Sequence, residues 1–315
     1  MPNNRGAIST EPKSVATKAL APKAHHPVSL AERVISIPGS ARVDAVASRL
    51  QELLVRAWRL PGGKRAKDFL NGTWFEHPLH PALTDIPIGA WTTAVVLDAA
   101  TLTGKRNFDA AASAALSLGV AGAVGAALSG LADWSDTGGA QRRIGLAHAG
   151  MNTMALALQL ASLWGRRRRM RGARVLSLAG LGVAATAAHL GGDLVYRLGT
   201  QVNRTAWDRG ARDFTPVMSA AELALDRPTR VLAAGAPVVL VRHQGNIHAL
   251  DDVCSHAGCS LSQGQVADGA ITCPCHGSTY RLRDGAVIRG PSPFAQPAYD
   301  VRIDDRRICV RIRPR

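Results

Sequence analysis

Four long apolar stretches occupy the middle of the chain and set its plan. Each is close to the roughly 20 residues that a helix needs to cross a bilayer, and they cover residues 83–103, 108–131, 144–164 and 175–196. Buried helices of a soluble protein can have the same length and composition. Four such stretches joined by short charged connections nevertheless favour a membrane bundle. We therefore expect an all-α four-helix transmembrane domain over residues 77–200.

Two segments precede this domain. Residues 43–58 repeat apolar side chains at helical spacing between arginines, which predicts an amphipathic helix within an approach segment over residues 41–76. Such a helix either lies on the lipid surface or packs on the rest of the protein. Residues 1–40 are rich in Ala, Pro, Ser, Thr and Lys without apolar periodicity. They predict a disordered tail that is not a standard secretory signal.

The last hundred residues change to the period of β-strands. Apolar runs at residues 237–241 and 247–250 flank a turn at residues 244–246, which is typical of a hairpin. Alternation returns near the C-terminus, at Tyr299, Val301, Ile303, Ile308, Val310 and Ile312. We expect an all-β domain over residues 216–315, joined to the helices by a polar linker over residues 201–215.

Charge and length narrow the classes of partner. The chain has 315 residues and a net charge of +15, and this length fits two domains. A basic balance is compatible with nucleic acid or acidic lipid as a partner. The sequence contains no nucleic-acid module, however, and aromatic residues for base stacking make up only 4% of the chain. We expect membrane lipid, and no nucleic acid, among the partners.

Two half-motifs within residues 254–280 carry the candidate chemistry. Cys254-x-His256 and Cys273-x-x-His276 each supply one thiolate and one imidazole. Two thiolates on one iron and two imidazoles on the other are the ligand set of a Rieske [2Fe–2S] cluster, with potentials of roughly −150 to +300 mV. Cys₂His₂ sets also bind zinc, although zinc fingers usually pair Cys with Cys and His with His. We expect one [2Fe–2S] cluster on these residues.

The neighbouring residues resemble those of Rieske proteins from cytochrome bc-type complexes. This resemblance implies an antiparallel β-sandwich, a disulfide between Cys259 and Cys275, and a Pro-rich loop at residues 290–293 that covers the cluster. It also implies that Ser278 and Tyr280 donate hydrogen bonds to a cluster sulfide and to a ligand sulfur. Such bonds raise the potential. The alternative is a low-potential ferredoxin in which these hydroxyls are incidental.

Polar residues near the ends of the apolar stretches form a second candidate site. Up-and-down threading gathers them on one side of the bundle, called side A here, where the first helix begins. The layer comprises His77, His80, Asp85, Asp133, His148, Asn152, His189 and Asp193. Ionisable groups at membrane depth usually mark a site. Three interpretations remain open: haem b with His148 and His189 as axial ligands, a quinone site, or an interhelical polar network without a ligand.

The membrane region resembles an uncharacterised family of bacterial four-helix membrane domains, some of which are fused to a C-terminal Rieske domain. The resemblance covers residues 70–200 and depends on the motifs at residues 77–81, 85–89, 130–134 and 191–196. It supports the architecture and assigns no chemistry. Asp98 lies nearer the opposite side B, and we expect it to be paired or to face water.

Basic residues in the connections predict the orientation in the bacterial cytoplasmic membrane. Side A carries Arg142 and Arg143 opposite two aspartates. Side B carries more, namely Lys105, Arg106, Arg166, Arg167, Arg168, Arg169, Arg171 and Arg174. We therefore expect side B in the cytoplasm and the Rieske domain on the extracytoplasmic side, where a disulfide persists.

These features predict a membrane-bound electron-transfer protein that carries one electron at a time. It is expected to be an oxidoreductase component rather than a stand-alone catalyst, with a redox partner protein or quinone as its partner. In one interpretation quinol or a haem in the membrane domain supplies the electrons. In the others the helices are only an anchor, and the protein is a ferredoxin-like shuttle for a separate oxygenase or reductase, or a redox sensor.

Overall fold

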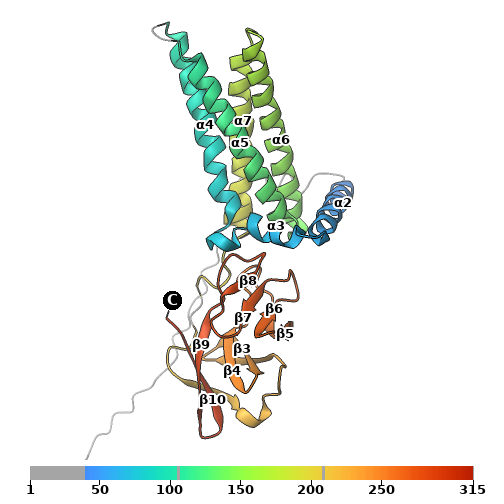
Figure 1. Ribbon diagram of the computed structural model, residues 1–315, viewed down its shortest axis with the longest axis vertical. Coiled ribbons are helices and arrows are strands. Elements are labelled where there is room, and N and C mark those ends of the chain that lie inside the picture. The colour runs from blue at the N-terminus through green and yellow to red at the C-terminus, as the bar shows by residue number, and fades with distance from the viewer. Residues whose placement is uncertain (1–39, 105–106, 208–209, 315) are drawn as a thin grey trace, which may run out of the picture.

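A helical domain and a β domain lie end to end in the computed structural model, which describes residues 40–104, 107–207 and 210–314 (Figure 1). The tail expected over residues 1–40 falls outside the described residues, apart from Ser40, which begins the first helix. Lys105 and Arg106, used above for the orientation, also lie outside them. The expected fold class, an all-α part followed by an antiparallel β part, is confirmed.

Four long helices pack side by side in the helical domain: α4 (Leu79–Leu102), α5 (Asp109–Trp134), α6 (Gly139–Arg167) and α7 (Ala173–Gly192), which continues as a π-helical turn, η2 (Asp193–Arg197). Small residues allow the close packing. A Cβ added at Gly119 of α5 would lie 2.3 Å from the ring of Trp91 on α4. Trp91, Leu116 and Ala155 form the buried centre, where α4, α5 and α6 meet.

The outer surface of this bundle is apolar. Large hydrophobic side chains are exposed on all four helices, among them Val96, Leu118, Leu160 and Leu178. Within the described part of the chain, two helices are long and apolar enough to cross a membrane, Asp109–Trp134 and Ala173–Arg197. Length and composition alone therefore do not confirm the expectation of four membrane-spanning helices.

Two further helices cover the side A end of the bundle (Figure 1), namely α2 (Ser40–Arg59) and α3 (Gly63–Leu70), and a 3₁₀ turn, η1 (Thr73–Phe75), follows them. The helix α2 packs along one edge, because Ala47 is fully buried and Gln51 donates hydrogen bonds to the carbonyl oxygens of Trp134 and Thr137. Its other apolar side chains, including Leu53, stay exposed. The amphipathic helix thus packs on the protein and still presents an apolar face.

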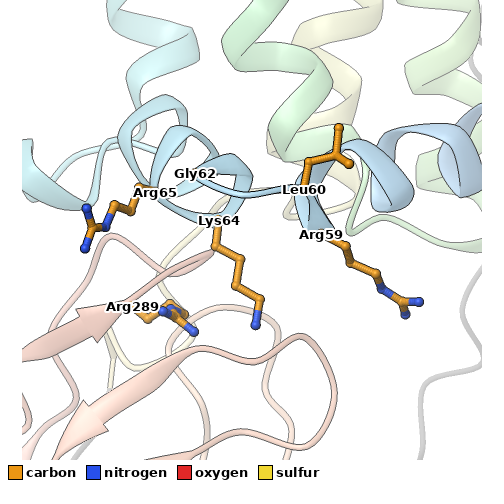
Figure 2. A pocket seen from close by; sticks show the side chains of 6 residues that line it. All are labelled: Arg59, Leu60, Gly62, Lys64, Arg65 and Arg289. Carbon is orange, nitrogen blue, oxygen red and sulfur yellow. The ribbon is translucent and has the colours of Figure 1, made fainter.

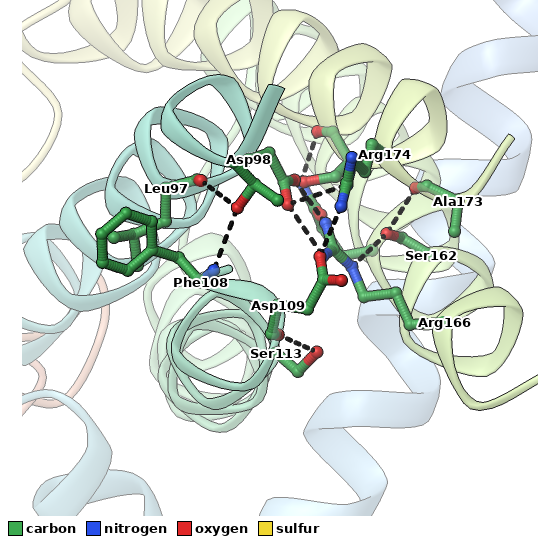
Figure 3. A network of polar contacts seen from close by, with 12 residues as sticks. Leu97, Asp98, Phe108, Asp109, Ser113, Ser162, Arg166, Ala173 and Arg174 are labelled. Carbon is green, nitrogen blue, oxygen red and sulfur yellow. Dashed lines mark hydrogen bonds and ion pairs between the residues drawn. The ribbon is translucent and has the colours of Figure 1, made fainter. Parts of the chain in front are cut away.

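The helices α4 and α5 form one helical hairpin, and α6 and α7 form a second. A network of ion pairs connects these two hairpins at side B (Figure 3). Asp98 of α4 receives hydrogen bonds from both terminal nitrogens of the Arg166 guanidinium on α6, one of them 2.8 Å long. Arg174 lies 3.7 Å from Asp98 and 2.7 Å from Asp109. The expected pairing of Asp98 is confirmed.

Two antiparallel sheets build the β domain. The larger has the order β1-β10-β9-β4-β3-β2 and the smaller the order β5-β6-β7-β8. Their strands are β1 (Thr215–Ser219), β2 (Thr229–Ala233), β3 (Ala236–His243), β4 (Asn246–Asp251), β5 (Gln265–Ala267), β6 (Ala270–Thr272), β7 (Thr279–Arg281), β8 (Val287–Arg289), β9 (Ala298–Asp304) and β10 (Arg307–Ile312).

Strand β3 separates two cores, because successive side chains of a strand point to opposite faces. Val239 and Val241 face the smaller sheet and join the core that also contains Cys254 and Cys273. Val238 and Leu240 face the other core. The two candidate cysteine ligands are therefore anchored directly in the packing between the two sheets.

Candidate metal centre

Two loops of matching conformation carry the candidate ligands, one after β4 and one between β6 and β7. The N–H groups of Cys254 and Cys273 each donate to a carbonyl oxygen five residues ahead, at 2.8 Å in both loops. In return, the N–H groups of Gly258 and Gly277 donate to the carbonyls of those cysteines. Both glycines have a φ near +80°, which favours glycine because it has no Cβ.

The four predicted ligands lie together at the end of the β domain. Cys254 and Cys273 are buried free thiols, and the Cys254 thiol, through its hydrogen bond, lowers the pKa of the Cys273 thiol. The rings of His256 and His276 lie 4.9 Å apart between centroids. Burial lowers the pKa of His256 to about 3, so its imidazole is neutral, which is the form that binds metals.

One orphaned atom tests whether these residues fit a metal cluster. Within the described residues, Nδ1 of His256 is buried without a hydrogen-bond partner, which is unfavourable unless another group binds it. Two buried thiols and two neighbouring imidazoles are also the donor set of a Rieske cluster. The residues therefore fit a [2Fe–2S] cluster.

The disulfide expected between Cys259 and Cys275 is confirmed, and it joins the two loops. The sulfur of Cys273 lies within 4.8 Å of both disulfide sulfurs. This trio is not a second metal site, because disulfide sulfurs are not thiolates and only thiolates bind metals in this way. Ser278 occupies in the second loop the position that Cys259 occupies in the first, because each lies five residues after the cysteine ligand of its own loop.

The hydroxyl of Tyr280 contacts the sulfur of Cys254, and the hydroxyls of Ser255 and Ser278 belong to the same two loops. The Tyr280 hydroxyl lies 3.2 Å from this sulfur and 2.9 Å from the Ser255 hydroxyl. Ser278 is fully buried, and its oxygen accepts a hydrogen bond from the N–H of Ser292 at 3.0 Å. The hydrogen of Ser278 therefore remains available for a further acceptor. Burial raises the pKa of Tyr280, so its hydroxyl stays protonated and can donate.

The segment at residues 290–296 braces the first loop. Ser292 contacts the Ser255 hydroxyl at 2.8 Å. Gln296 accepts a hydrogen bond from the N–H of Ser255 and donates to the carbonyls of Asp251 and Val253. The sequence interpretation missed Gln296. A glutamine among apolar and proline residues gave no signal for this role.

The ligand end of the β domain docks on the side A end of the bundle (Figure 1). The N–H of Gly290 donates to Asp68 of α3 at 3.0 Å. Asp136, just after α5, is close enough to His276 to raise its pKa, although burial lowers that pKa overall. Lys67 forms an ion pair with Asp136 at 2.7 Å. The docking role of these residues was not identified from the sequence, because it depends on how the two domains meet.

The structure brings together part of the polar layer expected at side A. His80 and His148 lie 6.2 Å apart between ring centroids, and Asn152 donates to Nε2 of His148. Asp133 instead accepts a hydrogen bond from Asn71 at 2.8 Å, and Asp193 pairs with Arg197 at 3.7 Å. The remaining members, His77, Asp85 and His189, are exposed.

The two central histidines sit in matching settings. Nδ1 of His80 hydrogen-bonds to the carbonyl of Ala126 at 2.7 Å, and Nδ1 of His148 to that of Ala187 at 2.8 Å. Gly130 lies four residues after Ala126, and Gly191 lies four residues after Ala187. A Cβ at Gly130 would lie 2.9 Å from the ring of His80, and a Cβ at Gly191 would lie 3.1 Å from the ring of His148. His189 lies two residues, or about 200°, beyond Ala187 and therefore faces away from His148.

The fold and the paired loops define an iron–sulfur protein of the Rieske class, and the comparisons agree. Residues 213–300 match the Rieske [2Fe-2S] domain, and residues 76–204 match a family described as "Predicted membrane protein (DUF2231)". The chain belongs to the Rieske [2Fe-2S] family. These matches also confirm the fusion of a Rieske domain to a bacterial membrane domain that the sequence motifs implied.

Relatives cover the β domain. The cytochrome b6-f complex iron-sulfur subunit of Chlorobaculum tepidum is 41% identical over 75 residues, which are 24% of this chain and 40% of that subunit. The anthranilate 1,2-dioxygenase ferredoxin subunit of Burkholderia cepacia is 30% identical over 100 residues, 32% of this chain and 93% of that subunit. A solved carbazole 1,9a-dioxygenase ferredoxin from Nocardioides aromaticivorans IC177 is 29% identical over 32% of this chain and 98% of its own, with a TM-score of 0.31.

Three statements follow from these matches. The protein is an electron-transfer iron–sulfur protein with a [2Fe–2S] cluster. It works with a redox partner, and its helical domain matches a family of predicted membrane proteins. The chain spans less than half of the cytochrome b6-f subunit that it matches, so the partners of that complex are not carried over.

Proposed function

We propose that this protein is a membrane-bound one-electron carrier in which Cys254 and Cys273 hold one iron, and His256 and His276 hold the other. The shared position of the two loops, the neutral His256 and the disulfide bridge support this assignment. The cluster supplies reversible one-electron chemistry. The chain holds it, excludes water with the residues 290–296 segment, and places the histidines at the domain junction.

The docked position of the cluster supports our proposal that quinol is the electron donor. Gly290 and Asp68 hold the histidine end against the side A end of the bundle, where a membrane-soluble donor would arrive. The b6-f iron-sulfur subunit among the relatives is consistent with such a donor. The ferredoxin relatives favour the alternative, a shuttle for a separate oxygenase or reductase. A redox sensor is the third candidate.

Cluster reduction in isolated membranes separates these functions. Reduction by added quinol, followed by EPR, supports the proposal. Reduction only by a soluble NAD(P)H reductase would replace it with the shuttle. No turnover with either donor, together with a partner that binds in one redox state only, would identify a sensor.

We further propose a high-potential cluster, because the Tyr280 hydroxyl lies 3.2 Å from the Cys254 sulfur and the Ser278 hydrogen is available to a sulfide. Hydrogen bonds to the sulfurs raise the potential of iron–sulfur centres. A redox titration should place the midpoint above about 0 mV, in the upper part of the Rieske range. A midpoint far below that value would identify a ferredoxin-type centre.

We also propose a second cofactor, haem b, that His80 and His148 would hold, in place of the pair His148 and His189. Each Nδ1 is held by a backbone carbonyl, as is usual for metal-binding histidines. The competing view is a closed polar network, since Asn152 already donates to His148. A sharp reduced α-band that disappears in both H80A and H148A supports haem. Its absence from the purified holoprotein excludes it.

We propose that α4 to α7 all cross the membrane, because each exposes large apolar side chains outward. We also propose the extracytoplasmic side for the β domain, on the strength of the disulfide and the side B arginines. The basic residues of α2 and α3 lie on side A and oppose this orientation. A reporter fused after Arg315 decides the matter. Activity confined to the cytoplasm would reverse the assignment.

A further inference from the structure

A basic cavity lies where the helical and β domains meet (Figure 2). It has a volume of about 310 Å³ and is lined by Arg59, Leu60, Gly62, Lys64, Arg65 and Arg289. The first five residues come from the end of α2, the turn after it and the start of α3, and Arg289 ends β8. All the charged residues in this lining are cations. Their summed field therefore favours an anion.

Cations from different domains face the same space. Lys64 extends from α3 toward Arg289 of the β domain (Figure 2). Asp68 lies nearby, but its carboxylate is 3.8 Å from the Arg289 guanidinium, and the side chain of Arg289 is 48% exposed. An ion pair of this length and exposure is weak. An anion with several oxygens would bind Lys64 and Arg289 together, and phosphate suits both arginine and lysine.

The surroundings of the cavity indicate a lipid source for this phosphate. Leu60, Phe69 and Trp74 are each more than half exposed on the same end of the bundle. In Figure 2, Leu60 points toward the bundle while Lys64 points toward the β domain. Exposed apolar and aromatic side chains in the same segment as several cations are typical of the head-group level of a bilayer.

We propose that this cavity binds the phosphate of an anionic phospholipid head group through Lys64 and Arg289. The bound phosphate bridges α3 and β8. It thereby stabilises the docked position of the β domain, next to the contact between Asp68 and Gly290. This inference depends on the membrane placement proposed above.

The test uses the full-length holoprotein in nanodiscs of phosphatidylcholine, with or without phosphatidylglycerol. The amide of Gly290 reports docking, because it donates to Asp68 across the junction. We expect its hydrogen exchange to slow several-fold with phosphatidylglycerol. Each removed cation should weaken the preference for anionic lipid about fivefold, so K64Q/R289Q should lose it. Arg283→Gln is the matched control, on the turn at the far end of β7 and β8.

The outcomes are distinguishable. Equal exchange in both membranes, or an effect that persists in K64Q/R289Q, overturns the site. An equal effect of inorganic phosphate in phosphatidylcholine discs overturns the lipid as the occupant. Failure of the protein to enter nanodiscs would overturn the membrane placement, and this inference with it. Entry without any effect of phosphatidylglycerol contradicts this inference alone.

Discussion

At the scale of single residues, the Tyr280 hydroxyl lies 3.2 Å from the Cys254 sulfur, and we propose that it raises the potential of the cluster. We predict that Tyr280→Phe retains the cluster and lowers its midpoint potential by some tens of millivolts. The reason is the lost hydrogen bond to the Cys254 sulfur. A charge-assisted hydrogen bond of about 1.5 kcal/mol corresponds to at most ~65 mV for a one-electron couple. An EPR-monitored redox titration measures the shift.

The control for this prediction is Tyr299→Phe. Tyr299 is the other fully buried tyrosine, and it belongs to the core on the far side of the large sheet. The midpoint potential of the cluster in Tyr299→Phe should match that in the wild type. An unchanged potential in Tyr280→Phe would mean that this hydroxyl does not bond the reduced cluster.

The disulfide between Cys259 and Cys275 should matter for retention of the cluster. Its cysteines are 16 positions apart, and closing a loop of about that length stabilises a fold by roughly 3 kcal/mol. We predict that C259A/C275A loses the cluster absorbance at a temperature several degrees lower. The control C309A removes a buried cysteine of β10. A similar loss in C309A would point to general damage to the domain.

The sequence predicted that the four candidate ligands lie together, and it placed His80 and His148 in one polar layer, but it did not predict that these two histidines approach each other. Cys254 and His256 lie two positions apart in one loop, so local geometry joins them whatever the rest of the fold does. The approach of His80 and His148 depends instead on the rotation of two separate helices. A small change in helical phase decides which residues face inward, and His189 consequently faces outward.

At the scale of elements, the ion pairs at side B hold the two hairpins together. Asp98→Ala would leave Arg166 and Arg174 without their shared carboxylate. Breaking a buried pair in this way usually destabilises a protein by about 3–5 kcal/mol. We predict a clearly lower melting temperature in detergent. Asp109→Asn, at an aspartate that is 50% exposed, should change it little. Equal melting of both variants would contradict a structural role for Asp98.

Element types were predictable from the sequence, whereas their contacts were not. Apolar runs indicated the four long helices to within a few residues, and the turn at residues 244–246 fixed one hairpin. For α2, the amphipathic pattern left two placements open. The structure combines them, because Gln51 bonds the bundle end while Leu53 stays exposed. A pattern of apolar residues does not specify which neighbouring element packs against them.

At the scale of the whole molecule, Asp68 makes the stability of the folded protein sensitive to pH. Burial raises the pKa of Asp68 above its ordinary value of 3.8, against the lowering effects of Gly290 and Arg289. A raised carboxyl pKa contributes stability that is fully present below pH 3.8 and is lost as the pH rises through the raised value. The free energy of unfolding of the wild type should therefore fall over that interval, as measured by the protection factor of the Gly290 amide.

Two variants test this prediction. Asp68→Asn keeps an oxygen for the Gly290 N–H and has no charge, so its protection should not depend on pH. Asp68→Ala loses the hydrogen bond, worth about 1 kcal/mol, and should show roughly fivefold less protection at every pH. A pH dependence that persists in Asp68→Asn would assign it to another group.

The β domain is tethered to its own docking surface, since the described chain passes from η2 to β1 through one connection. A tether of this kind gives an effective concentration on the order of millimolar. A contact with a dissociation constant of 1 mM, or about −4.1 kcal/mol, is then enough to keep the domain docked half of the time. Few hydrogen bonds are needed for that. A competing protein dissolved at micromolar concentration cannot displace such a domain, whereas one confined to the same membrane can.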